Sequence, residues 1–148
     1  MVELAALLGL VGAEHGLSVV SIGRADGTVS TSVVNAGVLT HPVSGLDVVG
    51  FVVRGDSFKR RRLFIDPRVT ITIRVGWEWQ AVEGSAELIG PNDPCAAGSV
   101  DVPTLLRDIF VSAGGTHDDW ATYDLVMAEE GRTAVLVAPR RAYGNVGR

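Results

Sequence analysis

The sequence LSVVSIGR at residues 17–24, followed by Ala25-Asp26-Gly27 and by TVSTSVVNAGVL at residues 28–39, decides the fold class. Both flanking runs are rich in β-branched residues, and the second run alternates polar and apolar side chains. An Asp-Gly pair between two such runs predicts a β-hairpin, because this dipeptide adopts the turn that matches the twist of the flanking strands. Strands joined by a hairpin are antiparallel, so the pattern argues against a parallel sheet with crossover helices.

Further runs of β-branched residues extend this pattern along the chain. They predict strands at residues 47–54, 69–75, 79–89 and 132–138, the last one ended by Pro139. Gly84 indicates a bulge inside the longest of these strands. Good helix formers predict short helices at residues 2–14, 58–65, 101–113 and 117–130. We therefore expect a mainly β protein, a β-barrel with short helices and six to seven mostly antiparallel strands, as one domain over residues 1–148.

Composition places the chain among globular proteins that fold without internal disulfides. Of its 148 residues, 47% are hydrophobic and 20% are charged, and Cys95 is its single cysteine. No apolar run reaches the about 18 residues that a membrane span needs. The apolar opening stretch contains Glu3 and Glu14 and lacks a basic start, so it is a poor signal peptide. We expect a cytoplasmic protein without a membrane span.

Basic residues are concentrated in two segments of a chain whose net charge is −4. Residues 54–74 contain seven Lys or Arg against two acidic residues, and residues 132–148 contain four Arg and no acid. Such concentrated charge within an acidic protein indicates a site for a small anionic ligand, although solvated surface charge also explains a charge run. The acidic remainder of the chain argues against a nucleic-acid-binding protein.

Residues 57–69, SFKRRRLFIDPRV, carry the most specific indication of such a site. They follow a predicted buried strand and open a helix for which Asp56 or Ser57 is the expected cap. The expected buried side of this helix consists of Phe58, Leu63 and Phe64 or Ile65. The start of a helix presents backbone N–H groups, a serine hydroxyl and cationic side chains to an anion. The segment therefore predicts phosphate or polycarboxylate binding, with an amphipathic surface helix as the alternative.

Other common motifs of enzyme chemistry are missing from the sequence. It contains no Gly-rich dinucleotide-binding or phosphate-binding loop and no nucleophile elbow. His15, His41 and His117 are scattered, and Cys95 has no partner at metal-ligand spacing, so we expect no metal site. We assign no catalytic side chain and expect a bound cofactor to carry the chemistry of any reaction.

An ordered set of motifs resembles the pyridoxamine 5′-phosphate oxidase superfamily, the split β-barrel flavoproteins. The motifs are the Asp26-Gly27 hairpin, S-x-K-x-x-x-L-x-x-D-P-R-V at residues 57–69, V-E-G-x-A-E-L at residues 82–88, D-D-W-x-x-Y at residues 118–123 and R-x-Y-G at residues 141–144. Together they cover nearly the whole chain. The size and the R-x-Y-G ending resemble the small actinobacterial branch that binds the deazaflavin coenzyme F420.

This resemblance implies an FMN-binding-like split barrel that forms a homodimer with two cofactor clefts at the subunit interface. It implies an F420-dependent oxidoreductase that transfers a hydride from the reduced deazaflavin to an activated double bond of a small organic substrate. The two basic segments suit the acidic oligoglutamate tail of that cofactor. Three alternatives stay open: an FMN-dependent oxidoreductase of the same fold, a non-enzymatic F420-binding or carrier protein, and a nucleic-acid-binding module, against which the acidity outside residues 54–74 argues.

The matching positions imply a set of cofactor-binding residues. Lys59 and Ser57 match positions that hold the cofactor phosphate, and Phe58 replaces an arginine that is usual in the FMN-using oxidases, which favours F420 over FMN. Trp79 matches an aromatic position of the partner subunit that covers the cofactor, whereas Trp77 is expected to pack in the barrel wall. The remaining expected contacts are Ser30, Ser32, Asn35 and Arg54 along the ring and Arg60 and Arg61 at the phosphate or tail.

Overall fold

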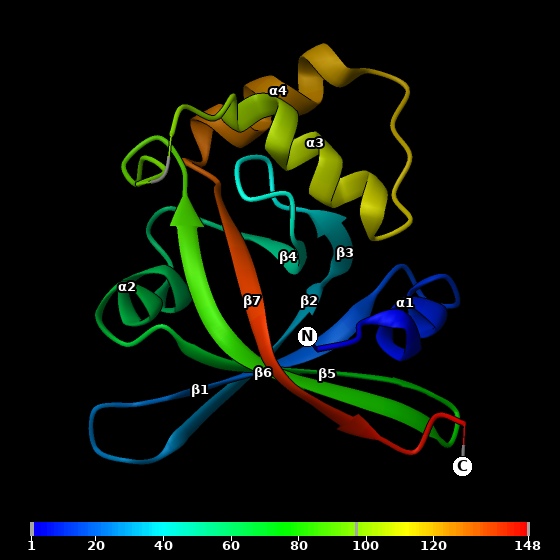
Figure 1. Ribbon diagram of the computed structural model, residues 1–148. Coiled ribbons are helices and arrows are strands. Elements are labelled where there is room, and N and C mark those ends of the chain that lie inside the picture. The colour runs from blue at the N-terminus through cyan, green and yellow to red at the C-terminus, as the bar shows by residue number, and fades with distance from the viewer. Residues whose placement is uncertain (1, 97, 148) are drawn as a thin grey trace.

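The computed structural model of the protein describes residues 2–96 and 98–147. The strands of this part of the chain are β1 (Leu17–Gly23), β2 (Val29–Asn35), β3 (Gly37–Thr40), β4 (Asp47–Val53), β5 (Arg68–Val75), β6 (Glu78–Ile89) and β7 (Thr133–Gly144). These seven described strands form one antiparallel sheet in the order β2-β1-β5-β6-β7-β4-β3, which Figure 1 shows strongly twisted. The mainly β, antiparallel fold expected from the sequence is confirmed.

The expected hairpin joins β1 and β2 at Asp26-Gly27. The carboxylate of Asp26 accepts hydrogen bonds from the backbone N–H and the hydroxyl of Thr28, at 3.0 and 2.6 Å. Gly27 has a φ of 87°, a conformation in which a side chain would be strained. The turn therefore fixes the register of the two strands, with Val19 opposite Val33.

Residues 28–39 do not form the single strand that the sequence predicts, because the strand is broken at Ala36. Residues before the break belong to β2 and pair with β1, whereas residues after it belong to β3 and pair with β4. Since β2 and β3 lie at opposite edges of the sheet, one linking residue forces the two edges to approach each other. The sheet consequently curls into a barrel whose seam lies beside Ala36.

Helices surround this barrel in the described part of the chain. They are α1 (Ala5–Val11), α2 (Phe58–Ile65), α3 (Val102–Ser112) and α4 (Trp120–Glu129), with α3 and α4 together at one end of the molecule (Figure 1). Helix α1 is shorter than predicted, because residues 12–16 form turns. Helix α2 begins as predicted, where the hydroxyl of Ser57 accepts a hydrogen bond from the backbone N–H of Arg60 at 3.2 Å.

The apolar core lies on both faces of the sheet. Alternate residues of β7 separate the two sides: Val135 and Val137 face the barrel interior, whereas Ala134 and Leu136 face the helices. The interior is filled by fully buried side chains such as Phe51, and α3 is packed against the outer side through Ile109. The α3–α4 unit is therefore a fixed part of the fold and not a loose insertion.

The last strand is longer than the sequence predicts. It continues through Pro139 to Gly144, so the R-x-Y-G motif is part of the sheet. The register between β6 and β7 shifts at Gly84, which lies opposite Pro139 and leaves Arg140 without a partner position on β6. This is the bulge expected at Gly84, and it tolerates the proline because the regular hydrogen-bond ladder is interrupted there.

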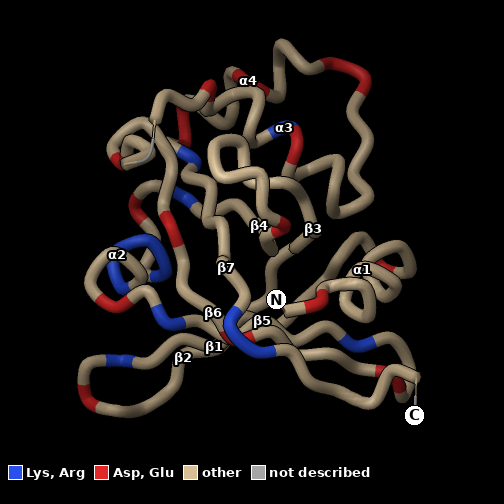
Figure 2. Tube along the Cα trace, in the orientation of Figure 1, with Lys and Arg blue, Asp and Glu red and all other residues tan. Residues whose placement is uncertain are grey.

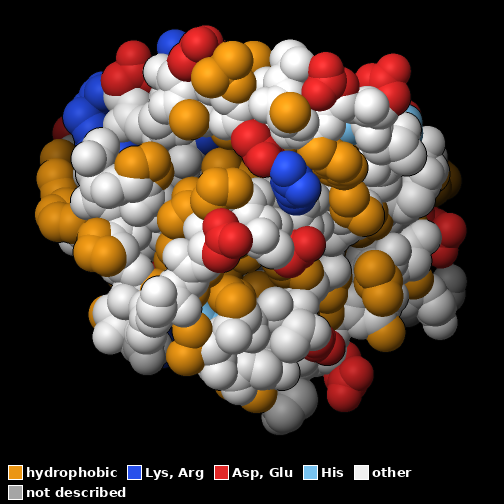
Figure 3. Space-filling model, turned by 90° about the horizontal axis from the view of Figure 1, so that it is seen from above, with side chains coloured by type: hydrophobic (Ala, Val, Ile, Leu, Met, Phe, Trp, Pro, Cys, Tyr) orange, Lys and Arg blue, Asp and Glu red, His pale blue; other side chains and the backbone are white. Residues whose placement is uncertain are grey.

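Several apolar side chains are exposed where burial was expected. Phe64 and Ile65 are 72% and 73% exposed, and only Leu63 of α2 is buried, because this short helix touches the barrel along a single line. Trp77 is 91% exposed, so its expected place in the barrel wall is wrong; it follows Gly76 at the tip of the β5–β6 turn. Figure 3 also shows apolar side chains between acidic ones on the face that carries α3 and α4.

None of the helices within residues 2–96 and 98–147 is both long enough and apolar enough to cross a membrane.

Candidate functional site

A cavity of about 760 Å³ opens beside the seam of the barrel. Its walls come from the end of β2, from the end of β4 with the turn that follows, and from α3 and the chain leading to and through α4. Its size lies within the range of about 300–1,000 Å³ that is usual for small-molecule sites. The cavity is therefore the candidate functional site.

One end of the cavity is basic and lies at the start of α2. Arg54, Ser57, Lys59 and Arg132 line it, and three of these are residues that the resemblance selected. Figure 2 shows Lys and Arg gathered on α2. Lys59 is half-buried and makes no ion pair or side-chain hydrogen bond among residues 2–96 and 98–147. Its ammonium group is available to an anion that the helix start also favours.

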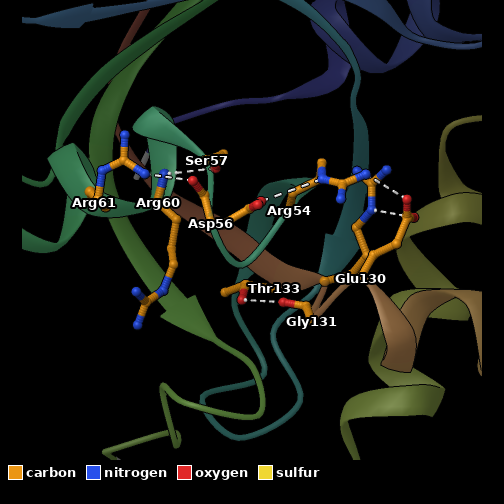
Figure 4. Close-up of polar contacts among 9 residues, drawn as sticks. Arg54, Asp56, Ser57, Arg60, Arg61, Glu130, Gly131 and Thr133 are labelled. Carbon is orange, nitrogen blue, oxygen red and sulfur yellow. Dashed lines mark hydrogen bonds and ion pairs between the residues drawn. The ribbon is translucent and has the colours of Figure 1, made fainter.

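Glu130, which the sequence analysis did not select, organises this basic end. Its carboxylate accepts a hydrogen bond from Arg54 at 2.7 Å and another from Arg132 at 3.1 Å (Figure 4). Arg54 also lies 3.4 Å from the carboxylate of Asp56. One carboxylate thus bridges two arginines that line the cavity, and these arginines belong to segments far apart in the sequence.

The backbone brings these segments together at a pair of glycines. The N–H of Gly55 donates to the carbonyl of Glu130 at 3.4 Å, and a Cβ on Gly55 would lie 2.6 Å from the carbonyl oxygen of Gly131. No larger residue fits at position 55 without moving the turn. The position of Glu130 is therefore set by the packing of the β4–α2 turn against the end of α4.

Arg60 and Arg61 do not line the cavity. Figure 4 shows Arg60 pointing away from Arg54 and Glu130, and its guanidinium forms two hydrogen bonds with Asp93, at 2.8 and 3.0 Å. Asp93 is buried, and its hydrogen bonds raise the pKa of Arg60. The guanidinium of Arg61 donates to the carbonyl of Asp56 at 2.5 Å. Arg60 is thus held in a structural pair that anchors the loop after β6.

Further basic residues of the two basic segments are also paired with acidic residues. Arg68 and Arg62 both contact Asp66, and the hydrogen bonds from Arg68 lower the pKa of Asp66 to about 2. Arg141 lies 3.8 Å from Glu83. Six of the eleven Lys and Arg of the two segments thus contact five carboxylates, so less of the charge remains for a polyanionic tail than the sequence suggests.

Three other predicted contacts lie outside the cavity. Ser30 and Ser32 are half-buried on β2, on the face opposite Val33. Trp79 packs edge-on against Tyr143, with ring centroids 6.1 Å apart, on the outer face of β6. Within one chain, therefore, the cavity gathers Asn35, Arg54, Ser57 and Lys59 from the predicted set and leaves out Ser30, Ser32, Arg60, Arg61 and Trp79.

The remainder of the cavity is mainly apolar and comes largely from α3 and α4. Ile109, Phe110 and Met127 line it beside Val52 of β4. Tyr123 also lines it; burial raises the pKa of its hydroxyl, which donates to the carbonyl of Leu106 at 3.2 Å. The sequence analysis missed these residues, and the apolar periodicity of the two helices was the one signal that could have pointed to them.

The end of the cavity away from Lys59 is formed by the turn after α1. His15 lines it together with Asn35 and Thr116. The side-chain amide of Asn35 donates to the carbonyl of His15 at 2.9 Å, and the imidazole Nδ1 of His15 lies 3.1 Å from the carbonyl oxygen of Gly114. Asn35 therefore holds the cavity wall in place with the group that was expected to face a cofactor ring.

No family model matches the chain, and no curated protein matches it in sequence. Solved structures share its fold. The conserved hypothetical protein Rv2991 from Mycobacterium tuberculosis is 19% identical, over 97% of this chain and 84% of its own, with a TM-score of 0.66. An F420 reductase is 14% identical, over 91% of this chain and 94% of its own, with a TM-score of 0.60. A candidate 5-nitroimidazole antibiotic resistance protein from Bacteroides thetaiotaomicron is 15% identical, over 97% of this chain and 84% of its own, with a TM-score of 0.68.

Proteins with other functions have the same fold. They include a candidate pyridoxamine 5′-phosphate oxidase from Listeria innocua, with 11% identity and a TM-score of 0.56, and a heme-binding protein from Mycobacterium smegmatis, with 17% identity and a TM-score of 0.61. The alignments cover 97% and 100% of this chain, and 98% and 57% of those proteins. Identities this low establish the split-barrel fold and leave the function to the site.

Proposed function

We propose that the protein binds coenzyme F420 in the cavity beside the seam and uses it, as an oxidoreductase, to reduce an activated double bond of a small organic substrate. The observation that carries this proposal is the combination within one cavity of a basic end at a helix start and a mainly apolar remainder. A phosphorylated cofactor with a flat ring system has the same two parts. The presence of an F420 reductase among proteins of this fold supports the choice of cofactor.

The residues present suit such a cofactor. Lys59 and the start of α2 at Ser57 would bind the phosphate, and Glu130 would hold Arg54 and Arg132 beside it. The ring would pack against the apolar walls, among them Val52, Phe110 and Met127. Bound F420, in its reduced form, supplies a hydride; the protein binds and orients both reactants and limits the access of water.

FMN is the second candidate cofactor, and a specific observation favours it. Because Arg60 is paired with Asp93, and Arg62 and Arg68 contact Asp66, fewer cations are left for an oligoglutamate tail than the sequence suggests. A single phosphate needs only the contacts at Ser57 and Lys59. Titrations with F420 and with FMN at the same ionic strength compare the two directly, and tighter binding of FMN would refute the F420 proposal.

A second copy of the chain completes the site in this proposal. The outer face of β1 and β2 exposes Leu17, Val19, Val29 and Val33, at 41–60%. Such a row of aliphatic side chains across paired strands suits an isologous contact with the same row of another copy. Trp79, on the outer face of the same sheet, would then cover the cofactor of the partner. Sedimentation equilibrium tests this, and a 15.6 kDa species that binds cofactor tightly would refute it.

Turnover separates the enzyme from the carrier alternative. F420 that is reduced beforehand should be oxidised by the protein in the presence of a conjugated enone, and the loss of the enone should match it mole for mole. Tight binding of F420 without turnover across a panel of enones and quinones would favour a carrier protein instead.

A further inference from the structure

His15 adopts a strained backbone conformation at the end of the cavity away from Lys59. Its φ is 55°, and no other non-glycine residue among those described has a positive φ. L-residues adopt this region at a cost, and such residues cluster at functional sites when the surrounding structure holds them there. Gly16 follows with a φ of 66°, and a Cβ there would lie 1.9 Å from the carbonyl oxygen of Ala36. The turn is thus packed tightly against the barrel seam.

Two hydrogen bonds from distant segments hold His15 in this position. Asn35, on β2, donates to its carbonyl oxygen at 2.9 Å, and its ring Nδ1 contacts the carbonyl oxygen of Gly114, between α3 and α4, at 3.1 Å. A carbonyl oxygen only accepts, so Nδ1 carries a proton and donates it. The ring orientation and the tautomer are therefore both fixed. Nε2 makes no hydrogen bond to any residue that the structure describes.

We propose that His15 is the proton donor of the site, acting through Nε2 on the substrate held against this end of the cavity. The inference rests on the proposed function. Reduction of a carbon–carbon double bond requires a hydride at one carbon and a proton for the electron pair that moves to the conjugated carbonyl. The reduced deazaflavin is oxidised as it gives the hydride, and the imidazolium of His15 gives the proton to the carbonyl oxygen. The neutral ring then takes a new proton from water, and the enol product converts to the ketone.

The other histidines do not compete for this role. His41 is buried, its Nδ1 accepts hydrogen bonds from the backbone N–H groups of Val43 and Ser44, and its Nε2 lies 2.7 Å from Glu87. His117 is not among the residues that line the cavity; it packs against Phe110, with ring centroids 6.3 Å apart. His15 is consequently the histidine that lines the cavity and has a ring nitrogen without a hydrogen bond to a described residue.

The charged and titratable groups around His15 are few. Glu14 precedes it in the same turn. Arg54, Lys59, Tyr123 and Arg132 are the other charged or titratable residues that line the cavity. The segment that contacts the ring contributes only a backbone carbonyl, from Gly114, and Asn35 is neutral at any pH.

Nuclear magnetic resonance of the ring Cε1–H groups tests contact directly, because the chain has three histidines. Addition of F420 together with cyclohexenone should shift the His15 signal, while the signals of His41 and His117 stay in place. F420 binding is measured in the same samples by its fluorescence. A His15 signal that stays unmoved when both ligands are bound would overturn the proposal, whatever the rate of turnover.

The variant His15→Asn keeps a side chain that tolerates the left-handed conformation and removes the imidazole. We expect its kcat with cyclohexenone to fall by about 100-fold or more, the usual contribution of a general acid, with nearly unchanged affinity for F420. The variant His117→Asn, on the adjacent segment, is the matched control and should behave as wild type.

The outcomes distinguish a failure of the proposed function from a failure of the role proposed for His15. A wild-type protein that does not bind F420 refutes the proposed function and this inference together. A protein that binds F420, with a wild-type rate in His15→Asn, refutes the inference alone and leaves the proposed function standing. If cyclohexenone is not reduced by the wild-type protein, the resonance experiment decides alone.

Discussion

Lys59 and Arg60 are adjacent cations on α2, and the structure predicts opposite consequences for their removal. Lys59 lines the cavity without a carboxylate partner in the described chain, whereas Arg60 forms two hydrogen bonds with Asp93 outside the cavity. We therefore expect Lys59→Ala to weaken cofactor binding with little effect on folding. Arg60→Ala should instead destabilise the fold with little effect on cofactor affinity.

The magnitudes follow from burial. A charge-assisted contact from Lys59 contributes about 1.5–3 kcal/mol, so its loss should raise the Kd by about one to two powers of ten. Removal of Arg60 leaves Asp93, whose side chain is 6% exposed, without its partner. Breaking a fully buried pair costs about 3–5 kcal/mol; since the side chain of Arg60 is 22% exposed, we expect about 2–3 kcal/mol. For a chain of this length that corresponds to a Tm lower by about 4–12 °C.

Two measurements on the wild-type protein, Lys59→Ala and Arg60→Ala test these opposite effects on cofactor affinity and on stability. Fluorescence titration with F420 at fixed ionic strength gives the Kd, and urea unfolding of the apo protein gives the free energy of unfolding. Asp93→Ala is the control for the structural pair, and its combination with Arg60→Ala should cost less than the sum of the single changes. If Arg60→Ala lost more affinity than Lys59→Ala at equal stability, the assignment of the two cations would be wrong.

Three further outcomes are expected. Arg68 holds the pKa of Asp66 at about 2 instead of 3.8, so the carboxylate stabilises the folded state above about pH 4 and loses this effect as the pH falls to about 2. The difference in unfolding free energy between the wild-type protein and Asp66→Asn, measured by urea titration, should therefore shrink as the pH falls over that interval. Gly37→Ala should destabilise the protein and reduce cofactor affinity, because its Cβ would lie 2.1 Å from the hydroxyl of Ser112 and push α3 off the sheet, as thermal unfolding and titration can check. Val19→Asp should yield monomers in sedimentation equilibrium, because a charge in the proposed contact face would be desolvated; an intact dimer would contradict that choice of face.

The order of elements was predictable wherever a local pattern decided it. The Asp26-Gly27 hairpin, the Ser57 cap and the bulge at Gly84 all depend on residues close in sequence, and all three are present. The break at Ala36 was not predictable, because nothing in the alternation of residues 28–39 distinguishes one long strand from two that pair with different neighbours. Pairing partners are a tertiary property, and they override the local pattern.

The candidate site was predictable only in part, for an electrostatic reason. Ser57 and Lys59 belong to a local helix-start motif, and both line the cavity. The acidic partners of the arginines are remote: Glu130 is 76 residues from Arg54, and Asp93 is 33 residues from Arg60. A count of charges along the sequence adds up cations that the fold later pairs with such carboxylates, so it overestimates the basic surface.

Because of the seam at Ala36, the wall of the barrel is not closed by hydrogen bonds between its two edge strands, β2 and β3. Strands β2 and β4 flank the cavity but share no ladder of backbone hydrogen bonds, and the chain itself joins the two sheet edges at Ala36, whose N–H continues the β1–β2 ladder by donating to the carbonyl of Gly16 at 2.9 Å. A barrel whose edge strands are joined only through one residue can widen at the seam by bending of the sheet, and every hydrogen-bonded strand pair stays intact. We therefore expect that the width of the cavity between β2 and β4 can change without the loss of a strand pair, with Ala36 as the residue at which the two edges stay joined.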